Sequence, residues 1–474
     1  MKRLCLVALF LMGFVATMWG QGGDGLKIGD TTWKFDGEIR FMYTDQTDPD
    51  NWDFFVKDSD SFNRMYQRYR LGISAQMGDS LKAYYMLQVG DEQWGNKNYN
   101  EREINLRSLY AYLEFTPEWL GTTAIRVGLQ PYDDLFQYSV FSDEAIGLLV
   151  MPTTDKLAAR IGFLTLRDDD VDQDVGYYKS KLGFISEGIL PCADTLFLAD
   201  ATYKMTDSLT IKGAFFYEYL RNLPVVSEDI SMTHNMAFYG VGADYASETL
   251  GYGAHFIMRS GTTDIYNDSD ELAGTYDFSG YFAYAYGSYT MNDFTVKVNF
   301  GYTPWKNETE NDAEGVTHYT KSNWAGAFAM VEMDDGEALY FGHNSGNQWM
   351  SAYGLEYYGR GDVCDRQALM NSYGGYEGLM VISINASYKW AFANLGFIRS
   401  SSDIYYTDDP EADIFDTNIG TEIDLGVKTE IMKNLQFSIV YAMFMPGDYW
   451  MYDMSSDTEL GTAHELSTQL KYTF

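Results

Sequence analysis

The chain has 474 residues and a formal net charge of −35, with 44 Gly and 39 Tyr against 9 Pro. So large an acidic excess argues against nucleic acid as a partner, because a phosphate backbone requires basic patches. The length would allow two or three soluble domains, but no Pro- or Ser-rich linker, composition shift or fixed-period repeat divides the sequence. Many Gly and Tyr with few Pro fit an all-β chain with many strands and tight turns.

The first residues predict export. Lys2 and Arg3 precede an apolar run at 4–19 that is too short for a spanning helix, and small residues follow it. We therefore expect residues 1–22 to be a signal peptide and residues 23–474 to form a single domain; a retained anchor helix is the alternative. Nothing later in the sequence is a long apolar helix, so insertion into a membrane would require a β-barrel.

The segment 33–43 has the alternation of a membrane strand. One face carries Trp33, Phe35, Ile39, Phe41 and Tyr43, and the other carries Lys34, Asp36, Glu38 and Arg40. Four successive charges on one strand face cannot point into a dry core, because burying unpaired charge costs too much free energy. They can line water inside a barrel while the aromatic face meets lipid.

The same alternation recurs in pairs of segments joined by turns of three to five residues. With a first and a last strand added, the pattern predicts a transmembrane antiparallel β-barrel of about 18 strands, with 16 as the alternative, short periplasmic turns and long extracellular loops. Aromatic residues precede five short turns, as a girdle at the lipid–water boundary would. These residues are Phe115, Tyr203, Tyr245, Tyr289 and Tyr388. The paired segments are 64–77 with 81–90, 108–116 with 122–130, 144–151 (of unclear parity) with 156–166, 195–205 with 209–219, 236–246 with 250–260, 279–290 with 294–303, 378–388 with 392–398, and 419–429 with 435–445.

The last residues, 463–474, place apolar side chains on one face and polar ones on the other, and the chain stops on Phe474. This ending resembles the terminal strand of bacterial outer-membrane β-barrels. The resemblance implies that Leu470, Tyr472 and Phe474 form an assembly signal for the barrel-assembly machinery. It also implies an outer-membrane location, with membrane lipid and lipopolysaccharide as neighbours.

Many of the Asp and Glu residues fall in three long connections, at 44–62, 167–194 and 401–418. Asp170-x-Asp172-x-Asp174 invites a calcium site, but the glycine comes one residue late and the closing Glu is missing. We favour the interpretation that these connections are solvated loops, bridged through divalent ions to lipid phosphates, and we expect no metal site and no cofactor.

Cys192 and Cys364 either form a disulfide between loops or remain isolated thiols. The connection 304–377 is either a lid or constriction, or a packed surface loop.

The inward face of the early strands is rich in basic residues. Nine of them face three acids there, and Arg and Lys in a pore favour anions. The alternative is that these residues pair with opposite acids and brace the wall. Tyrosine and phenylalanine also face inward, where they suit either sugars or the packing of an inserted loop. The predicted pore-lining basic residues are Lys34, Arg40, Arg64, Arg68, Arg70, Lys82, Arg126, Lys156 and Arg160, and the predicted pore-lining aromatic residues are Tyr66, Tyr84, Tyr110, Tyr112, Phe282, Tyr284 and Tyr286.

The segments 69–72 (Tyr-Arg-Leu-Gly), 109–113 (Leu-Tyr-Ala-Tyr-Leu) and 126–130 (Arg-Val-Gly-Leu-Gln) give the chain a resemblance to the alginate-export porin family. That resemblance implies 18 strands, an Arg-rich lumen and acidic outer features. We expect a passive outer-membrane channel for small or acidic solutes, including anions and acidic sugars. A structural or adhesive barrel is the alternative. An enzyme is disfavoured, because His255 is the one histidine expected to face the lumen in mid-strand and no catalytic motif surrounds it. The sequence does not indicate an oligomeric state.

Overall fold

The computed structural model describes fourteen stretches of the chain, and most of their residues belong to one β-sheet. The sheet has 21 strands and closes on itself, and 18 of the strands form the wall of a barrel. No helix in the described stretches is long and apolar enough to cross a membrane. The described residues are 25–47, 61–94, 106–136, 142–165, 194–224, 231–266, 272–302, 307–311, 317–321, 379–400, 404–405, 414–415, 418–447 and 461–474.

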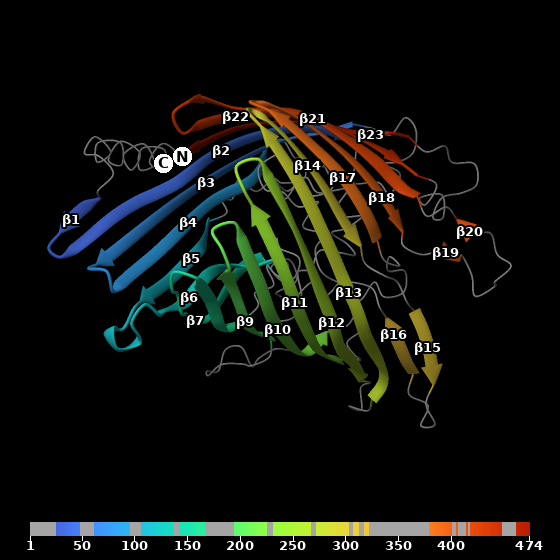
Figure 1. The fold of residues 1–474 in the computed structure, drawn as a ribbon, viewed down its shortest axis with the longest axis horizontal. Helices are drawn as coiled ribbons and strands as arrows, with labels where there is room; N and C mark the ends of the chain where they lie inside the picture. Colours follow the sequence, from blue (N-terminus) through green and yellow to red (C-terminus); the bar gives the residue numbers. More distant parts are fainter. Residues whose placement is uncertain are drawn as a thin grey trace.

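The wall strands follow one another around the barrel in chain order, each antiparallel to its neighbours (Figure 1). The additions to the wall are β1 (Leu26–Ile28), β15 (Asn307–Asn311), β16 (Thr317–Lys321), the 3-10 helix η1 (Glu118–Leu120), and the separate pair β19 (Ile404–Tyr405) and β20 (Ile414–Phe415). The wall strands are β2 (Thr31–Thr47), β3 (Ser61–Met77), β4 (Leu81–Trp94), β5 (Leu106–Phe115), β6 (Ala124–Asp133), β7 (Ser142–Met151), β8 (Leu157–Thr165), β9 (Asp194–Lys204), β10 (Leu209–Pro224), β11 (Ser231–Ala246), β12 (Leu250–Tyr266), β13 (Leu272–Met291), β14 (Phe294–Tyr302), β17 (Leu379–Tyr388), β18 (Ala391–Ser400), β21 (Asn418–Met432), β22 (Leu435–Pro446) and β23 (Ala463–Thr473).

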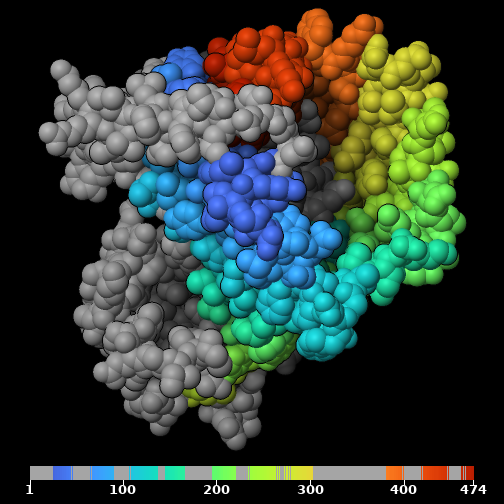
Figure 2. All heavy atoms as spheres, turned by 90° about the vertical axis from the view of Figure 1, so that its left-hand side faces the viewer, coloured from blue at the N-terminus to red at the C-terminus, as the bar shows by residue number. Residues whose placement is uncertain are grey.

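The barrel is closed by its first and last strands. β2 pairs with β3 along one edge and with β23 along the other, from Glu38 opposite Thr473 to Gln46 opposite Glu465. The red C-terminal strands adjoin the blue N-terminal ones in Figure 2, and the yellow and green strands continue the wall. The predicted count of 18 strands is confirmed, and each predicted segment overlaps one wall strand; the largest difference is at β13, which begins at Leu272 and not at residue 279.

The two faces of the wall have opposite character, as β12 illustrates. Phe256 and Met258 are 39% and 52% exposed, whereas Ile257 and Arg259, which alternate with them, are buried on the inner side. Exposed apolar side chains on one strand face, repeated around the barrel, form the lipid-facing surface of a membrane barrel. A polar or charged side chain such as Arg259 therefore faces the lumen.

The short turns contain the residues that tight hairpins require. Gly78, Asn292, Lys389 and Asn434 all have positive φ, between 54° and 65°. Hairpin turns that match the twist of the strands need φ above zero, which Gly and Asn adopt most easily.

The aromatic residues that precede these turns lie on the outer face. Tyr203, Tyr289 and Tyr388 are about half exposed, and Phe115 and Tyr245 are less so. The expected girdle is therefore present at the short-turn end of the barrel.

Several expectations concern residues outside the described stretches. They are the signal peptide at 1–22, Asp170, Asp172 and Asp174 with most of the acidic connections, Cys192 and Cys364, and most of the connection 304–377. Within that last connection the structure does describe β15 and β16, and β16 runs parallel to Gly274–Phe278 of β13. The sequence pattern predicted neither this pair nor β1.

Candidate functional site: the barrel lumen

The early strands carry arginines that pair with carboxylates across the inner face. Arg68 donates from Nε and Nη2 to Oε1 of Glu38, at 2.9 and 2.6 Å, and both side chains are about nine-tenths buried. Lys471 approaches the other oxygen of Glu38 at 3.4 Å. This group joins β2, β3 and β23, so it lies at the closing seam of the barrel.

Two further arginines have a common arrangement. Arg126 donates from Nε and Nη2 to Glu114 at 2.8 and 2.6 Å, and its guanidinium lies 4.8 Å from the centre of the Tyr112 ring. Arg160 donates from Nε and Nη2 to the two oxygens of Asp200, at 3.0 and 2.7 Å. Its guanidinium lies 4.2 Å from the centre of the Tyr132 ring.

In both cases the carboxylate and the ring fix the plane of the guanidinium. Both side chains remain about a quarter exposed, Arg126 at 23% and Arg160 at 26%. The third nitrogen of each, Nη1, has no hydrogen-bond partner among the described residues. Each arginine can therefore still donate a hydrogen bond to an anion in the lumen.

A cluster of tyrosines lies beside Arg126 near the short-turn end. The Tyr84 ring lies 5.4 Å from that of Tyr112 and 6.3 Å from that of Tyr110, and its hydroxyl donates to Asp36 at 2.8 Å. Lys82 extends over the Tyr84 ring at 5.6 Å. The cluster gives this end of the lumen flat, partly exposed ring faces with cations beside them.

The later strands carry a ladder of hydrogen-bonded Tyr and Asn side chains that ends at a carboxylate. Tyr284 on β13 donates to Asn299 on β14 at 2.9 Å, and Asn299 donates in turn to Asn385 on β17 at 2.7 Å. Asn385 donates to Asn394 on β18 at 3.0 Å, which reaches Asp424 on β21 at 3.4 Å. Hydrogen-bonded side chains across five strands brace this side of the wall.

At the end where β6 leads into β7, the hairpin formed by these two strands leaves the wall. β6 pairs with β5 from Ile125 to Leu129, and β7 pairs with β8 from Ile146 to Val150. Beyond these points β6 and β7 pair with each other alone, Gln130–Asp133 opposite Ser142–Ala145. We call residues 130–136 with 142–145 the inner hairpin.

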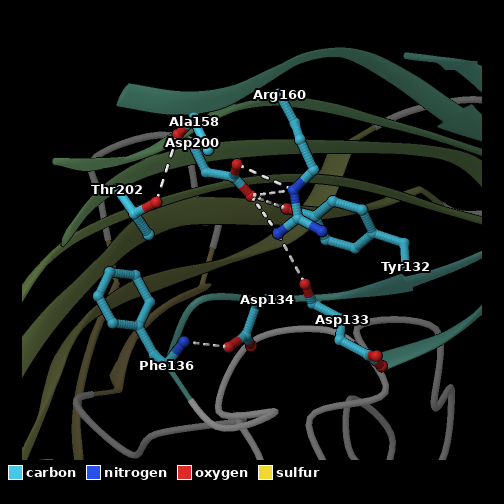
Figure 3. Close-up of polar contacts among 8 residues, drawn as sticks. All are labelled: Tyr132, Asp133, Asp134, Phe136, Ala158, Arg160, Asp200 and Thr202. Atoms are coloured by element: carbon cyan, nitrogen blue, oxygen red, sulfur yellow. Dashed lines mark hydrogen bonds and ion pairs between the residues drawn. The ribbon is translucent and has the colours of Figure 1, made fainter. Parts of the chain in front are cut away.

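Side chains of the wall hold the inner hairpin inside the barrel (Figure 3). The Tyr132 hydroxyl donates to Asp200 on β9, and Nη2 of Arg160 on β8 donates to the Asp133 carbonyl oxygen at 2.7 Å. Asp134 accepts a hydrogen bond from the Phe136 backbone N–H at 2.6 Å, which turns the chain at that point. Tyr132, Asp134 and Phe136 are almost fully buried.

Phe136 reaches strands five and six positions further around the barrel. Its ring lies 5.5 Å from that of His255 on β12 and fills the space beside Gly240 on β11, where a Cβ would collide with it. His255 stacks in turn on Tyr284 at 4.6 Å. The described part of the inner hairpin therefore crosses part of the lumen, and Phe136 contacts the wall formed by β11 to β13.

The predicted pore-lining basic residues differ in their partners and in their burial. Arg68, Arg126 and Arg160 pair with acids, Arg70 donates to Gln88 at 2.7 Å, and Arg40 is buried. Lys34 is exposed at the start of β2, and Lys156 lies in the turn before β8 rather than in the strand. The side chains of Arg64 and Tyr66 lie outside the described residues.

Phe282, Tyr284 and Tyr286 are on the inner face, and two of them contact His255. Sequence reasoning did not identify Tyr132, Phe136 or the ladder from Asn299 to Asn394 as lumen residues. Among the described residues, no three potential metal ligands come together.

No protein-family model matches the chain, and no curated protein matches it in sequence. Solved structures do match in fold. OpdK of Pseudomonas aeruginosa, solved with vanillate, has a TM-score of 0.50 and 10% identity, over 93% of this chain and 98% of that one. OprD of Pseudomonas aeruginosa has a TM-score of 0.49 and 12% identity, over 93% of this chain and 95% of that one.

Identities this low carry the fold and nothing finer. The porin part of the resemblance seen in the sequence holds at the level of the fold, and the alginate-export part remains a prediction. With its closed 18-stranded wall and apolar outer surface, this chain is an antiparallel transmembrane β-barrel with the fold of the outer-membrane porins that it matches.

Proposed function

We propose that the protein is a passive outer-membrane channel for small anionic solutes, acidic sugars among them. The observation that carries the proposal is the pair Arg126 and Arg160. Each is held by a carboxylate and a tyrosine ring, and each keeps one guanidinium nitrogen accessible. A carboxylate that passes either arginine can accept a hydrogen bond without disturbing the wall.

The two arginines are close enough to act in succession. Arg126 is level with Leu149 of β7, and Leu149 is level with Gly162 of β8, two residues beyond Arg160. Strand spacing and rise put their backbones roughly 12 Å apart. An anion could leave one arginine as it approaches the other, which is what conduction through several weak sites requires.

We propose that the nine predicted basic residues line the pore as a group and that the solute contacts two of them, Arg126 and Arg160. Arg68 has a different role, because it is buried with Glu38 at the seam. The tyrosine cluster at Tyr84 offers ring faces to a sugar next to the cation of Arg126. We further propose that lipid and lipopolysaccharide surround the barrel and that the barrel-assembly machinery inserts it.

A pair of opposite substitutions tests the proposal. Arg126→Gln leaves Glu114 unpaired and should shift the reversal potential in a KCl gradient toward cation preference. Glu114→Gln leaves Arg126 unpaired and should shift it the other way. One unit charge about 5 Å from an ion in water changes its energy by about 0.8 kcal/mol, or about fourfold in local concentration. The measurement is made on purified protein in planar bilayers.

The outcome also separates the alternatives. A wild-type channel that prefers cations, and that neither substitution changes, would contradict anion conduction past Arg126. Folded protein with no ion conductance would instead favour the structural or adhesive barrel. We propose no enzymatic activity, because among the described residues His255 packs against aromatic rings and no catalytic arrangement surrounds it.

A further inference from the structure

Two tyrosines near the short-turn end of the lumen are anchored in the same way. Tyr84 on β4 donates from its hydroxyl to Asp36 on β2 at 2.8 Å, and Tyr286 on β13 donates to Asp244 on β11 at 3.1 Å. Each hydrogen bond passes over a glycine of the strand in between, where a Cβ would collide with the carboxylate and the tyrosine. The glycines are Gly72 on β3 and Gly253 on β12. The two arrangements lie nine strands apart in a wall of 18, so they face each other across the lumen.

A lysine lies over each anchored ring. Nζ of Lys82 is 5.6 Å from the centre of the Tyr84 ring, and Nζ of Lys297 is 4.9 Å from the centre of the Tyr286 ring. A ring attracts an ammonium group through its quadrupole, so it holds the lysine without supplying an opposite charge. Among the described residues, neither lysine forms an ion pair with a carboxylate. Each ring therefore positions a lysine that no ion pair neutralises.

The arrangement around Tyr286 contains a second lysine. Lys212 on β10 pairs with Asp244 at 2.5 Å, and their side chains are 21% and 24% exposed. The charge of Asp244 is thus offset by Lys212, and the charge of Lys297 remains. The group as a whole has a net charge of about +1 in partly exposed side chains, which attracts anions from the lumen.

The arrangement around Tyr84 has no counterpart of Lys212. Asp36 forms no ion pair with the lysines and arginines that the structure describes, so its charge offsets that of Lys82. The strand before β2 in the wall is β23, and its ladder to β2 ends opposite Glu38, before the level of Asp36 is reached. The net positive charge is therefore found on the later strands.

The side chains at the level of Lys297 leave it open to an anion. Its partners in the ladders to β13 and β17 are Ser288 and Asn385, which carry no charge. Arg126 and Arg160 differ, because each is directly opposite the acid with which it pairs. An anion can approach Lys297, which is half-buried, without competing with an acid, and the ammonium group has three N–H donors to offer.

We propose that Lys297, held over the Tyr286 ring, is a docking site for a solute oxyanion, either a carboxylate or a phosphate. Lys212 assists by neutralising Asp244. The proposal rests on the channel function above and adds a solute contact on the later strands, across the lumen from Arg126.

The test is a binding measurement on the full-length protein refolded in detergent micelles. Dimethylation of the lysines with a ¹³C label keeps their charge and gives each one an NMR signal, and the Lys297 signal is the one that is lost in Lys297→Arg. Sodium gluconate, sodium phosphate and sodium chloride are added separately at equal ionic strength. Gluconate or phosphate should shift the Lys297 signal until it saturates, and chloride should shift it far less. Lys389 is the internal reference, because it lies 5.3 Å from the Tyr388 ring but is exposed in a turn and pairs with Asp293.

Three variants locate the site. Lys297→Met should abolish the saturable shift of the neighbouring Lys212 signal. Lys212→Gln restores the charge of Asp244 and should weaken binding at Lys297 about fourfold, by the charge effect given for Arg126. Tyr286→Leu removes the ring under Lys297 and should weaken binding about two- to fivefold. Lys389→Met is the matched control and should leave the response of Lys297 unchanged.

Each outcome has a distinct meaning. A response to gluconate alone identifies a carboxylate site, and a response to phosphate alone identifies a phosphate site. An equal response to chloride would show general screening, and the site would be wrong. A wild-type channel that conducts anions while Lys297 responds to neither oxyanion would also overturn the site but leave the channel function intact. Saturable binding at Lys297 in a protein without ion conductance would support the site and contradict the channel function instead.

Discussion

Replacing Glu38 by glutamine is expected to lower the free energy of unfolding by about 3 kcal/mol, because the change removes the charge that balances a buried arginine. Glu38 accepts two hydrogen bonds from Arg68 and lies 3.4 Å from Lys471. The three residues come from β2, β3 and β23, so the loss falls on the seam where the barrel closes. Urea unfolding of protein refolded into lipid vesicles measures the effect.

The control for this substitution is Glu114→Gln, which breaks the same kind of pair where it is about a quarter exposed. Its cost should be about 1 kcal/mol or less, because water screens the remaining Arg126. Equal losses for the two variants would contradict a special contribution from the seam. A loss in Glu114→Gln alone would place the critical ion pair on β5 and β6 instead.

The alternation of side chains was enough to predict the wall. A strand with charges on one face and aromatic rings on the other is stable only where the charged face meets water and the aromatic face meets lipid. Segments such as 33–43 therefore predict both the barrel architecture and the face of each strand that points into the lumen. The turns added independent support, because Asn292 and Asn434 are residue types that adopt positive φ readily. These local signals need no knowledge of what surrounds the strand.

The inner hairpin could not be predicted in the same way. The segment 144–151 had unclear parity because both faces of β7 are apolar: Ile146 is exposed on the outside, while Ala145 and Leu149 are buried inside. The residues between the predicted segments 122–130 and 144–151 fall on a long connection, which the barrel pattern predicts to be extracellular. The signal that points inward is Pro131, which has no N–H to donate to a neighbouring strand. Its meaning depends on contacts with β8, β9 and β11, which lie far along the chain.

The charges of the lumen were predictable by position but not by partner. Alternation gives the face of Arg68 and Arg160, but not that Arg68 is buried at the seam while Arg160 keeps a nitrogen free for solute. That difference depends on which acid lies across the neighbouring strand, Glu38 in one case and Asp200 in the other. A tally of inward charges therefore overstates the number that an ion meets.

Deleting Phe474 is expected to reduce sharply the amount of protein in the outer membrane. The Phe474 N–H donates to the Gly37 carbonyl oxygen at 3.0 Å, and its own carbonyl oxygen accepts from the Gly37 N–H at 2.9 Å. These bonds extend the β2–β23 ladder to the end of the chain. The ring covers Gly37 and stacks on Tyr472 at 6.1 Å. Two hydrogen bonds and partial burial of one ring amount to about 3 kcal/mol at the closing strand.

Phe474→Ala separates the two contributions, because it keeps both backbone hydrogen bonds and removes only the ring. If the aromatic ring is what the assembly machinery reads, Phe474→Ala should reduce membrane levels nearly as much as the deletion. If the ladder matters more, its level should lie close to wild type. Either variant, once refolded in vitro, should conduct as the wild type does, because the Phe474 ring packs over Gly37 and Tyr472 on the outer face of the wall. Normal membrane levels after the deletion would contradict a role of Phe474 in assembly, and altered conductance would show that closure of the seam reaches the pore.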